Sequence, residues 1–262
     1  MNQLSLASAL PDDLIEVWFV DFADLPEVLP AAYDEVLDET ERTRRARFLF
    51  ERDRRTYAVA HALVRWMLSS FQPSVPPREW SFTTNDYGRP EIAASFASDL
   101  RFNLSHTRGA ALCGVARRRD LGVDLEAVDR QASCVELADR YFAPAEVADL
   151  RRHAPQRQRE AFFDYWTLKE AYIKARGMGL AIPLDGFAFH LRAGEAIRLD
   201  CAAELADDGR AWTFAQWSFG ERFRAATAAR CAAGEMLRVM YRRVVPFVHL
   251  GEPIPVPGFA PS

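Results

Sequence analysis

Two acidic residues on one expected strand are the first groups in the sequence that could do chemistry. The segment "LGVDLE" (residues 121–126) alternates as a β-strand does, which puts Asp124 and Glu126 together on one face and the apolar residues on the other. Neighbouring carboxylates repel each other unless they face open water or share a cation. All-oxygen ligands suit magnesium or calcium better than zinc or copper. The pair therefore indicates either a solvated strand face or part of a metal site.

A third carboxylate lies on an expected helix. The stretch "FFDYWTLKEAYIKARGMGL" (162–180) carries large apolar side chains on nearly every side, so the helix should be buried and should end near Gly177. Glu170 and Lys174 nevertheless share the stripe of Trp166. An exposed Glu-Lys pair is worth a few tenths of a kcal/mol, whereas desolvation costs several kcal/mol per ion. Both charges would be satisfied if the helix lined a site that holds a metal ion and phosphates. We favour that interpretation over a solvated ion pair.

Donors that suit an anion gather in other segments. "FNLSHTRG" (102–109) brings Ser105 and His106 into one expected loop after a strand, although a lone histidine is more often structural. "ERTRRARFLFERDRR" (41–55) holds seven arginines, and Arg89 lies in the turn "YGRP". Most arginines in such runs lie on a solvated surface. One or two of them can still clamp a phosphate.

The composition excludes several classes of protein. The 262 residues are 49% hydrophobic with a net charge of −4, so no overall field draws the chain to nucleic acid or to an anionic membrane. No segment reaches the roughly 18 uncharged apolar residues of a membrane span, and the first residues lack the features of a secretory signal. The four cysteines show no C-x-x-C spacing. We therefore expect a cytoplasmic globular protein with reduced cysteines.

The residue patterns predict a mixture of strands and helices. The expected elements are a strand at 15–20, a helical segment at 38–71 that could contain a break, strands at 100–105, 110–116 and 121–126, helices at 133–142, from 144 and at 162–180, and later strands in "FAFHLR", "WTFAQWSF" and "FRAATAAR". Ser133 is a candidate N-cap. "RRRD" (117–120) predicts a hairpin or a crossover between domains, and we place a domain boundary near residue 118. The proline-rich tail, 246–262, should run extended over the surface.

Taken together, "NLSH", "GVDLE" and "WTLKEAYIKARGMGL" resemble the motifs of the larger, surfactin-synthetase-activating (Sfp) type of phosphopantetheinyl transferase, in that family's order. The resemblance extends from "RFLFERDRRT" and "YGRP" through "ADRYFAPAE" to "IPLDGFAF", or roughly residues 40 to 190. It implies an α+β fold: a pseudo-dimer of two similar α/β halves, each with a helix packed on an antiparallel sheet, and coenzyme A in the cleft between them. The halves would be residues 1–118 and 119–262.

The resemblance also implies roles for single residues. Asp124, Glu126 and Glu170 would bind magnesium, and Lys174 would neutralise the transferring phosphate. The coenzyme A phosphates would be contacted by Arg55, Arg89, Ser105, His106 and Lys174. Glu170 is the candidate base for the serine proton, with a metal-bound water or hydroxide as the alternative. Arg42, Arg44, Arg45 and Arg55 cannot be separated by sequence, because a shift of one residue exchanges one arginine for another.

The implied reaction moves 4'-phosphopantetheine from coenzyme A to a serine of an apo acyl or peptidyl carrier protein and releases adenosine 3',5'-bisphosphate. The long chain argues against the short, trimeric class, so we expect a monomer, and fatty-acid, polyketide and nonribosomal-peptide carriers all fit. Two other functions fit part of the sequence less well. A non-catalytic module that binds coenzyme A or a carrier has no use for three carboxylates and Lys174, and a metal-dependent nuclease would need a basic surface.

Overall fold

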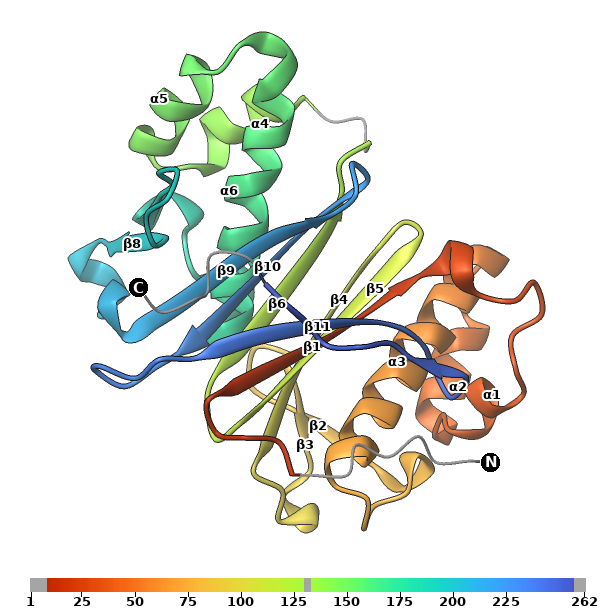
Figure 1. Ribbon diagram of the computed structural model, residues 1–262. Coiled ribbons are helices and arrows are strands. Elements are labelled where there is room, and N and C mark those ends of the chain that lie inside the picture. Colours follow the sequence, from red (N-terminus) through yellow and green to blue (C-terminus); the bar gives the residue numbers. More distant parts are fainter. Residues whose placement is uncertain (1–8, 130–132, 257–262) are drawn as a thin grey trace.

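The computed structural model describes residues 9–129 and 133–256 (Figure 1). In the N-terminal part, β1 is antiparallel to β5, and β5 is antiparallel to β4. The elements of this part are β1 (Leu14–Asp21), α1 (Ala32–Glu35), α2 (Glu39–Ala46), α3 (Glu51–Phe71), β2 (Phe82–Thr84), β3 (Pro90–Ile92), β4 (Leu100–Thr107) and β5 (Ala110–Arg117). The predicted helical segment at 38–71 consists of two helices, with a break between α2 and α3.

The C-terminal part has its own sheet, in which β10 lies between β6 and β9 and is antiparallel to both. A separate hairpin joins β7 and β8. The elements of this part are β6 (Leu121–Ala127), α4 (Cys134–Tyr141), α5 (Pro144–Arg152), α6 (Pro155–Arg176), β7 (Phe187–His190), β8 (Arg198–Cys201), β9 (Trp212–Phe219), β10 (Phe223–Arg230), β11 (Arg238–Val245), β12 (His249–Leu250) and β13 (Ile254–Pro255).

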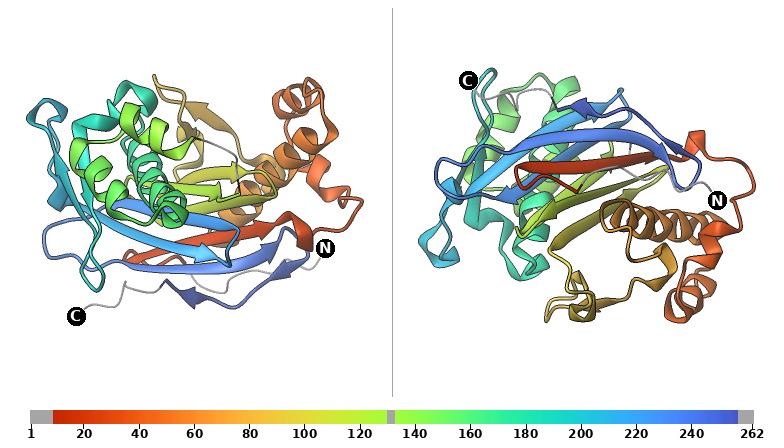
Figure 2. Two further views of the ribbon diagram at one scale, coloured as in Figure 1. Left: turned by 90° about the horizontal axis from the view of Figure 1, so that it is seen from above. Right: turned by 60° about the horizontal axis from the view of Figure 1, so that its bottom comes forward.

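The two parts repeat one topology. Each contains a strand, a long helix and two further strands, and the three strands are ordered β1-β5-β4 in one part and β6-β10-β9 in the other. The helices α1 to α3 and α4 to α6 form two separate groups on different sides of the strands (Figures 1 and 2). This arrangement confirms the predicted α+β fold with a helix on antiparallel strands in each half. One feature differs from that expectation: β11 returns to the first sheet and pairs with β1 in parallel.

Because side chains alternate along the strands, the two faces of each sheet contribute to different hydrophobic clusters, three in the described residues. Trp18 and Val20 of β1 pack with α3, whereas Val17 and Phe19 from the other face of β1 pack against the second sheet. The second sheet buries its opposite face against α6. The two sheets therefore share one cluster, and each long helix covers the outer side of its own sheet.

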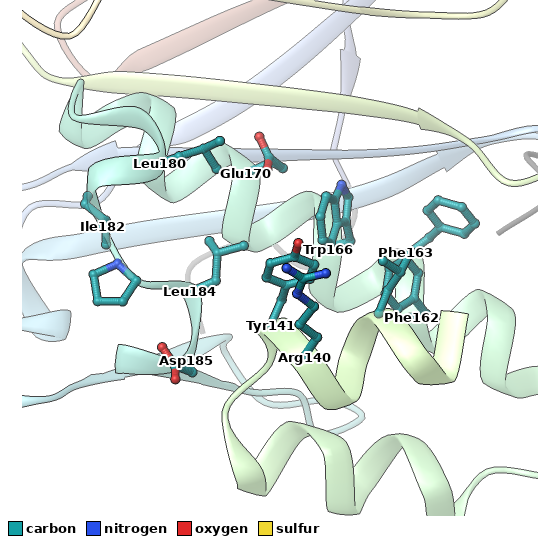
Figure 3. Close-up of a pocket in the computed structure, with 12 residues that line it drawn as sticks. Arg140, Tyr141, Phe162, Phe163, Trp166, Glu170, Leu180, Ile182, Leu184 and Asp185 are labelled. Atoms are coloured by element: carbon teal, nitrogen blue, oxygen red, sulfur yellow. The ribbon is translucent and has the colours of Figure 1, made fainter. Parts of the chain in front are cut away.

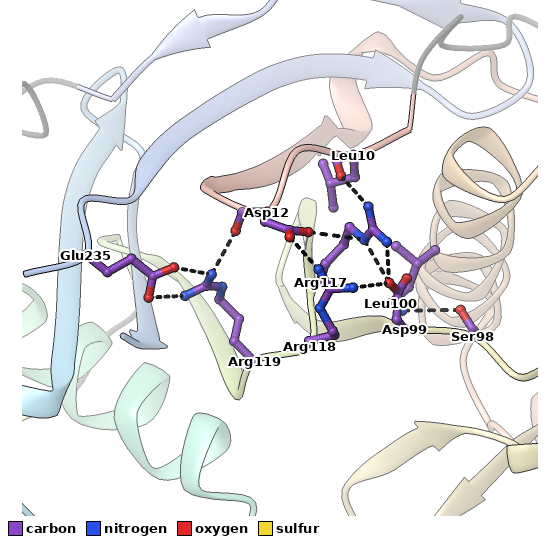
Figure 4. Close-up of polar contacts among 9 residues, drawn as sticks. All are labelled: Leu10, Asp12, Ser98, Asp99, Leu100, Arg117, Arg118, Arg119 and Glu235. Carbon is purple, nitrogen blue, oxygen red and sulfur yellow. Dashed lines mark hydrogen bonds and ion pairs between the residues drawn. The ribbon is translucent and has the colours of Figure 1, made fainter. Parts of the chain in front are cut away.

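The segment 117–120 is a crossover, because β5 and β6 belong to different sheets. Figure 4 shows its arginines bonded to carboxylates of distant segments: Arg117 and Arg118 to Asp99, and Arg119 to Glu235. These ion pairs tie the crossover to the strands around it. Since each of these guanidinium groups already has a carboxylate partner, the cluster is a structural junction.

Several local predictions can be compared with the structure directly. The strands expected at 15–20, 100–105 and 110–116 and the helix start at Pro144 are present. The loop expected to hold Ser105 and His106 is wrong, because β4 continues through Thr107 and pairs with β5 over its whole length. Ser133 precedes α4 as its N-cap residue, but its side chain makes no capping hydrogen bond. The tail from Pro246 contributes β12 and β13, which pair with β11, and residues 257–262 lie outside the described part. No helix within 9–129 and 133–256 is long and apolar enough to cross a membrane.

Candidate active site

The acidic strand β6 lies directly against helix α6 because Gly122 has no side chain. A Cβ atom at Gly122 would lie 1.9 Å from the carbonyl oxygen of Ala171 and 2.5 Å from the amide nitrogen of Ala175. No other residue allows this approach of strand and helix backbones. The contact brings Asp124, two residues further along β6, to Lys174 of α6.

Asp124, Ser105 and Lys174 form one hydrogen-bonded cluster. Oδ1 of Asp124 accepts from Lys174 Nζ at 2.6 Å and from Ser105 Oγ at 3.0 Å. Lys174 Nζ also donates to Ser105 Oγ at 3.1 Å. Asp124 is only 3% exposed, and its second oxygen, Oδ2, is buried without a hydrogen-bond partner in the described structure. A buried carboxylate oxygen with no donor is a place where a cation would be stabilised.

Glu170 lies close to this cluster and responds to its charge. Burial, and then the negative charge of Asp124, raise the pKa of the Glu170 carboxyl to about 6, while Lys174 opposes the shift. Glu170 and Asp124 therefore repel each other in the absence of a cation. The two carboxylates, one on a helix and one on a strand, thus lie near enough for their charges to interact.

Glu126 lies on the same face of β6 as Asp124. Its Oε1 accepts a hydrogen bond from Trp166 Nε1 of α6 at 3.1 Å. Within the described ranges, no group of three or more histidine, cysteine, aspartate or glutamate side chains is close enough together to hold a metal ion as it stands. The three predicted metal ligands thus share one region, with Asp124 bonded to Lys174 and Glu126 bonded to Trp166.

A buried ion pair fixes the rotation of α6. Lys169 Nζ contacts Glu146 at 2.7 Å and donates to the carbonyls of Leu184 and Phe187, with both charged side chains fully inaccessible to solvent. Burial lowers the pKa of Lys169 and raises the pKa of Glu146. Lys169 faces inward, so the next residue, Glu170, points in a different direction. Lys174 lies one turn after Glu170, and both face the side of β6 that carries Asp124.

Two histidines, His106 and His61, lie near Lys174. His106 is exposed, yet the surrounding protein removes enough water from its ring to lower its pKa, and the positive charges of Lys174 and His61 lower it further. His61 lies on α3, stacks on Tyr57 with ring centroids 3.9 Å apart, and contacts Glu41 at 2.7 Å. His61 was not predicted from the sequence, where it reads as one polar residue in an apolar helix.

The two arginines predicted to bind coenzyme A, Arg55 and Arg89, each have hydrogen-bond partners within the protein. Arg55 donates to the carbonyls of Pro26 and Glu27. Arg89 donates to the carbonyl of Ala175 at 2.8 Å and to Glu91 at 2.7 Å, so the turn "YGRP" docks on the C-terminal end of α6. Gly177 ends this helix with a φ of 67°, as expected from the sequence.

An apolar pocket opens beside Glu170 (Figure 3). Its volume is about 610 Å³, and its wall comes from α4, α6 and the segment 180–185. Figure 3 shows Glu170 between Leu180 and Trp166, with Tyr141 facing Leu184 across the pocket. The pocket could hold a slender, largely apolar group next to the carboxylates.

The geometry therefore defines a mixed α/β protein with a carboxylate and lysine site suited to phosphoryl transfer. The family model for the 4'-phosphopantetheinyl transferase superfamily matches residues 120–228, which include Asp124, Glu126, Glu170 and Lys174. The chain is 34% identical over 194 residues to the 4'-phosphopantetheinyl transferase HetI of Nostoc sp., covering 74% of this chain and 81% of HetI. It belongs to the 4'-phosphopantetheinyl transferase superfamily, as its motifs predicted.

Two further proteins are similar to this chain. The 4'-phosphopantetheinyl transferase Sfp of Bacillus subtilis is 29% identical over 154 residues, which cover 59% of this chain and 66% of Sfp. Among solved structures, a holo-[acyl-carrier-protein] synthase of Thermotoga maritima matches with 20% identity and a TM-score of 0.35, covering 52% of this chain and 84% of that one.

Proposed function

We propose that this protein transfers 4'-phosphopantetheine from coenzyme A to a serine of an apo acyl or peptidyl carrier protein, as a magnesium-dependent monomer acting in the cytoplasm. The serine oxygen forms a bond to the β-phosphorus of coenzyme A, and the bond from that phosphorus to the bridging oxygen breaks. Adenosine 3',5'-bisphosphate leaves with the electron pair of the broken bond. The observation that carries the proposal is the buried, half-satisfied carboxylate of Asp124 between Ser105, Lys174 and Glu170.

The donor set suits magnesium. Asp124, Glu126 and Glu170 supply only oxygen ligands, the orphaned Oδ2 of Asp124 lacks a partner, and Glu170 is electrostatically strained against Asp124. Bound magnesium would neutralise charge on the phosphate oxygens. Lys174 supplies a further positive charge, and its ammonium already lies within 3.4 Å of three acceptors on β4 and β6. We assign it to the transferring phosphate.

Glu170 is proposed as the general base. With a pKa of about 6, its carboxyl group is mostly ionised at neutral pH and can still accept a proton. Its place at the edge of the apolar pocket puts the carboxylate where the carrier serine and the phosphopantetheine arm would meet. The pocket wall would shield the arm from water while Glu170 takes the serine proton.

Ser105, His106, Arg55 and Arg89 are proposed as coenzyme A ligands. Support is strongest for His106, since Lys174 and His61 add positive charge around it, and an anion there would relieve the repulsion. For Arg55, binding a phosphate means exchanging the two carbonyl partners that the structure gives it, and a charge-assisted bond to phosphate is stronger than a bond to a neutral carbonyl. Arg89 would exchange the carbonyl of Ala175 in the same way, while its ion pair with Glu91 competes with the phosphate.

The proposal is tested by following adenosine 3',5'-bisphosphate chromatographically in a mixture of protein, coenzyme A, magnesium and an apo carrier. The nucleotide should form in step with modified carrier, and EDTA or Asp124→Ala should stop it. Asp200→Ala, which removes an exposed carboxylate on β8, should leave it unchanged. Release that survives EDTA, or an Asp124→Ala protein that is folded and fully active, would refute the assignment of the site.

A further inference from the structure

The two sheets of the molecule meet at strands β4 and β6, which run beside each other in the same direction. Each strand has its main-chain partner on the other side, β4 with β5 and β6 with β10. Over the described residues, β4 and β6 belong to separate sheets with no main-chain ladder between them. The seam between the two halves must therefore be held by side chains.

Three alternate side chains of β4 provide that connection. Each accepts a hydrogen bond from a backbone N–H of β6, and each joins a residue to the one 20 positions later. The three links run from Val123 N to Asn103 Oδ1 (2.9 Å), from Leu125 N to Ser105 Oγ (3.2 Å) and from Ala127 N to Thr107 Oγ1 (3.3 Å). We call these three residues of β4 the seam ladder.

The links of the seam ladder alternate with the acidic residues of the site. Asp124 lies between the first two links and Glu126 between the last two. The residues before and after each carboxylate therefore have their backbone N–H groups bonded to β4. Lys174 reaches the same seam from α6 and donates to the carbonyl of Val123 at 3.4 Å. The position of β6 relative to β4 thus sets the distance between the acidic residues and His106.

We propose that the seam ladder positions the metal-binding strand against the coenzyme A-binding strand, and that Asn103 and Thr107 are positioning residues for the transfer reaction. The inference rests on the proposed function, because it assigns the metal to β6 and the phosphates to β4. Neither Asn103 nor Thr107 touches the reacting groups. Their effect passes through the backbone amides of Val123 and Ala127.

The loss of one acceptor would release one backbone N–H of β6 at the seam. An N–H without an acceptor favours a strand position that reaches water or another acceptor. Both strands would keep their main-chain partners, β4 along β5 and β6 along β10. A broken link should therefore change how β6 and its carboxylates lie against β4, and leave the coenzyme A contacts within β4 nearly intact.

Thr107 offers an isosteric comparison. Thr107→Val removes the acceptor and keeps the shape of the side chain, whereas Thr107→Ser keeps the acceptor and loses a methyl group. Thr213→Val on β9 is the matched control. Thr213 is also half-buried on a strand, but its hydroxyl accepts from the thiol of Cys231 and not from a backbone N–H of β6. Binding of Mn2+ to the complex with coenzyme A, followed by electron paramagnetic resonance without carrier, reports on the metal site in the absence of turnover.

In Thr107→Val, we expect Mn2+ affinity and kcat each to fall by about tenfold, the magnitude typical of residues that orient metal ligands. The KM for coenzyme A should hardly change. Thr107→Ser and Thr213→Val should behave like the wild type. Equal Mn2+ affinity in Thr107→Val and Thr107→Ser, with an active wild type, would overturn the seam ladder and leave the proposed function standing.

A wild type that neither binds Mn2+ nor modifies a carrier would instead overturn the proposed function. If Thr107→Val fails to fold, Asn103 supplies the same comparison. Asn103→Leu removes the acceptor for Val123 N, and Asn103→Asp keeps an oxygen in its place. Rescue of Mn2+ binding by the aspartate relative to the leucine supports the inference, and equal losses in both variants contradict it.

Discussion

Removal of the buried lysine of α6, Lys169, should cost more stability than removal of any exposed cation. In Lys169→Met, Glu146 loses its ion-pair partner at 2.7 Å, and the carbonyls of Leu184 and Phe187 lose their donor. Breaking a buried ion pair from one side costs about 3 to 5 kcal/mol. The two orphaned carbonyls place the expected loss of unfolding free energy toward the upper end of that range.

Urea unfolding of Lys169→Met and of a control tests this value. Arg151→Met removes an exposed cation that contacts Asp139 at 2.7 Å, and it should cost less than about 1 kcal/mol. The deficit of Lys169→Met should shrink as the pH falls. Burial already raises the pKa of Glu146, so the folded variant binds that proton more tightly than the unfolded chain does, and its stability rises toward acid pH. Equal losses in Lys169→Met and Arg151→Met would refute the reasoning.

The remaining predictions concern the reaction. Lys174→Ala should lower kcat more than it raises the KM for coenzyme A, measured at steady state, because its charge is proposed to act on the transferring phosphate. Arg89→Ala should weaken coenzyme A roughly tenfold or more and leave 3'-dephospho-coenzyme A nearly unchanged, if the guanidinium binds the 3'-phosphate. The KM for coenzyme A should fall as the pH drops from neutral toward the lowered pKa of His106, because a bound phosphate favours protonated His106 over the neutral form. In His106→Gln this pH dependence should be lost.

Each of these predictions has an outcome that contradicts it. A change in KM alone would assign Lys174 to ground-state binding. A parallel rise for both substrates would leave Arg89 with its observed role, capping the carbonyl of Ala175 at the end of α6. An unchanged pH profile in His106→Gln would remove His106 from the phosphate site.

Features set by nearby residues could be predicted from the sequence. Alternation in "LGVDLE" gave the correct faces for Asp124 and Glu126, and Val123 is fully buried on the opposite side of β6. The end of α6 at Gly177 and the break between α2 and α3 also follow from local preferences. The placement of Glu170 near Asp124 follows from the cost of burying a charged side chain in an apolar helix. That cost is a local property, but it predicts a neighbour that is distant in the sequence.

Features that depend on distant partners could not be predicted. The parallel pairing of β11 with β1 joins the two ends of the chain, and no residue pattern in "RVMYRRVV" specifies that partner. The carbonyl partners of Arg55 and Arg89 are likewise set by how loops dock. In β4, the polar alternation of the seam ladder is visible in "NLSHT", but its role becomes clear only when β6 is seen beside it.

The most direct test of the central claim is the intact mass of an apo carrier protein after incubation with this protein, coenzyme A and magnesium. We expect the carrier to gain one phosphopantetheine group on a serine, and folded Asp124→Ala protein to add none. An unmodified carrier with folded wild-type protein, across acyl and peptidyl carriers, would show that this protein is not a phosphopantetheinyl transferase for these carriers.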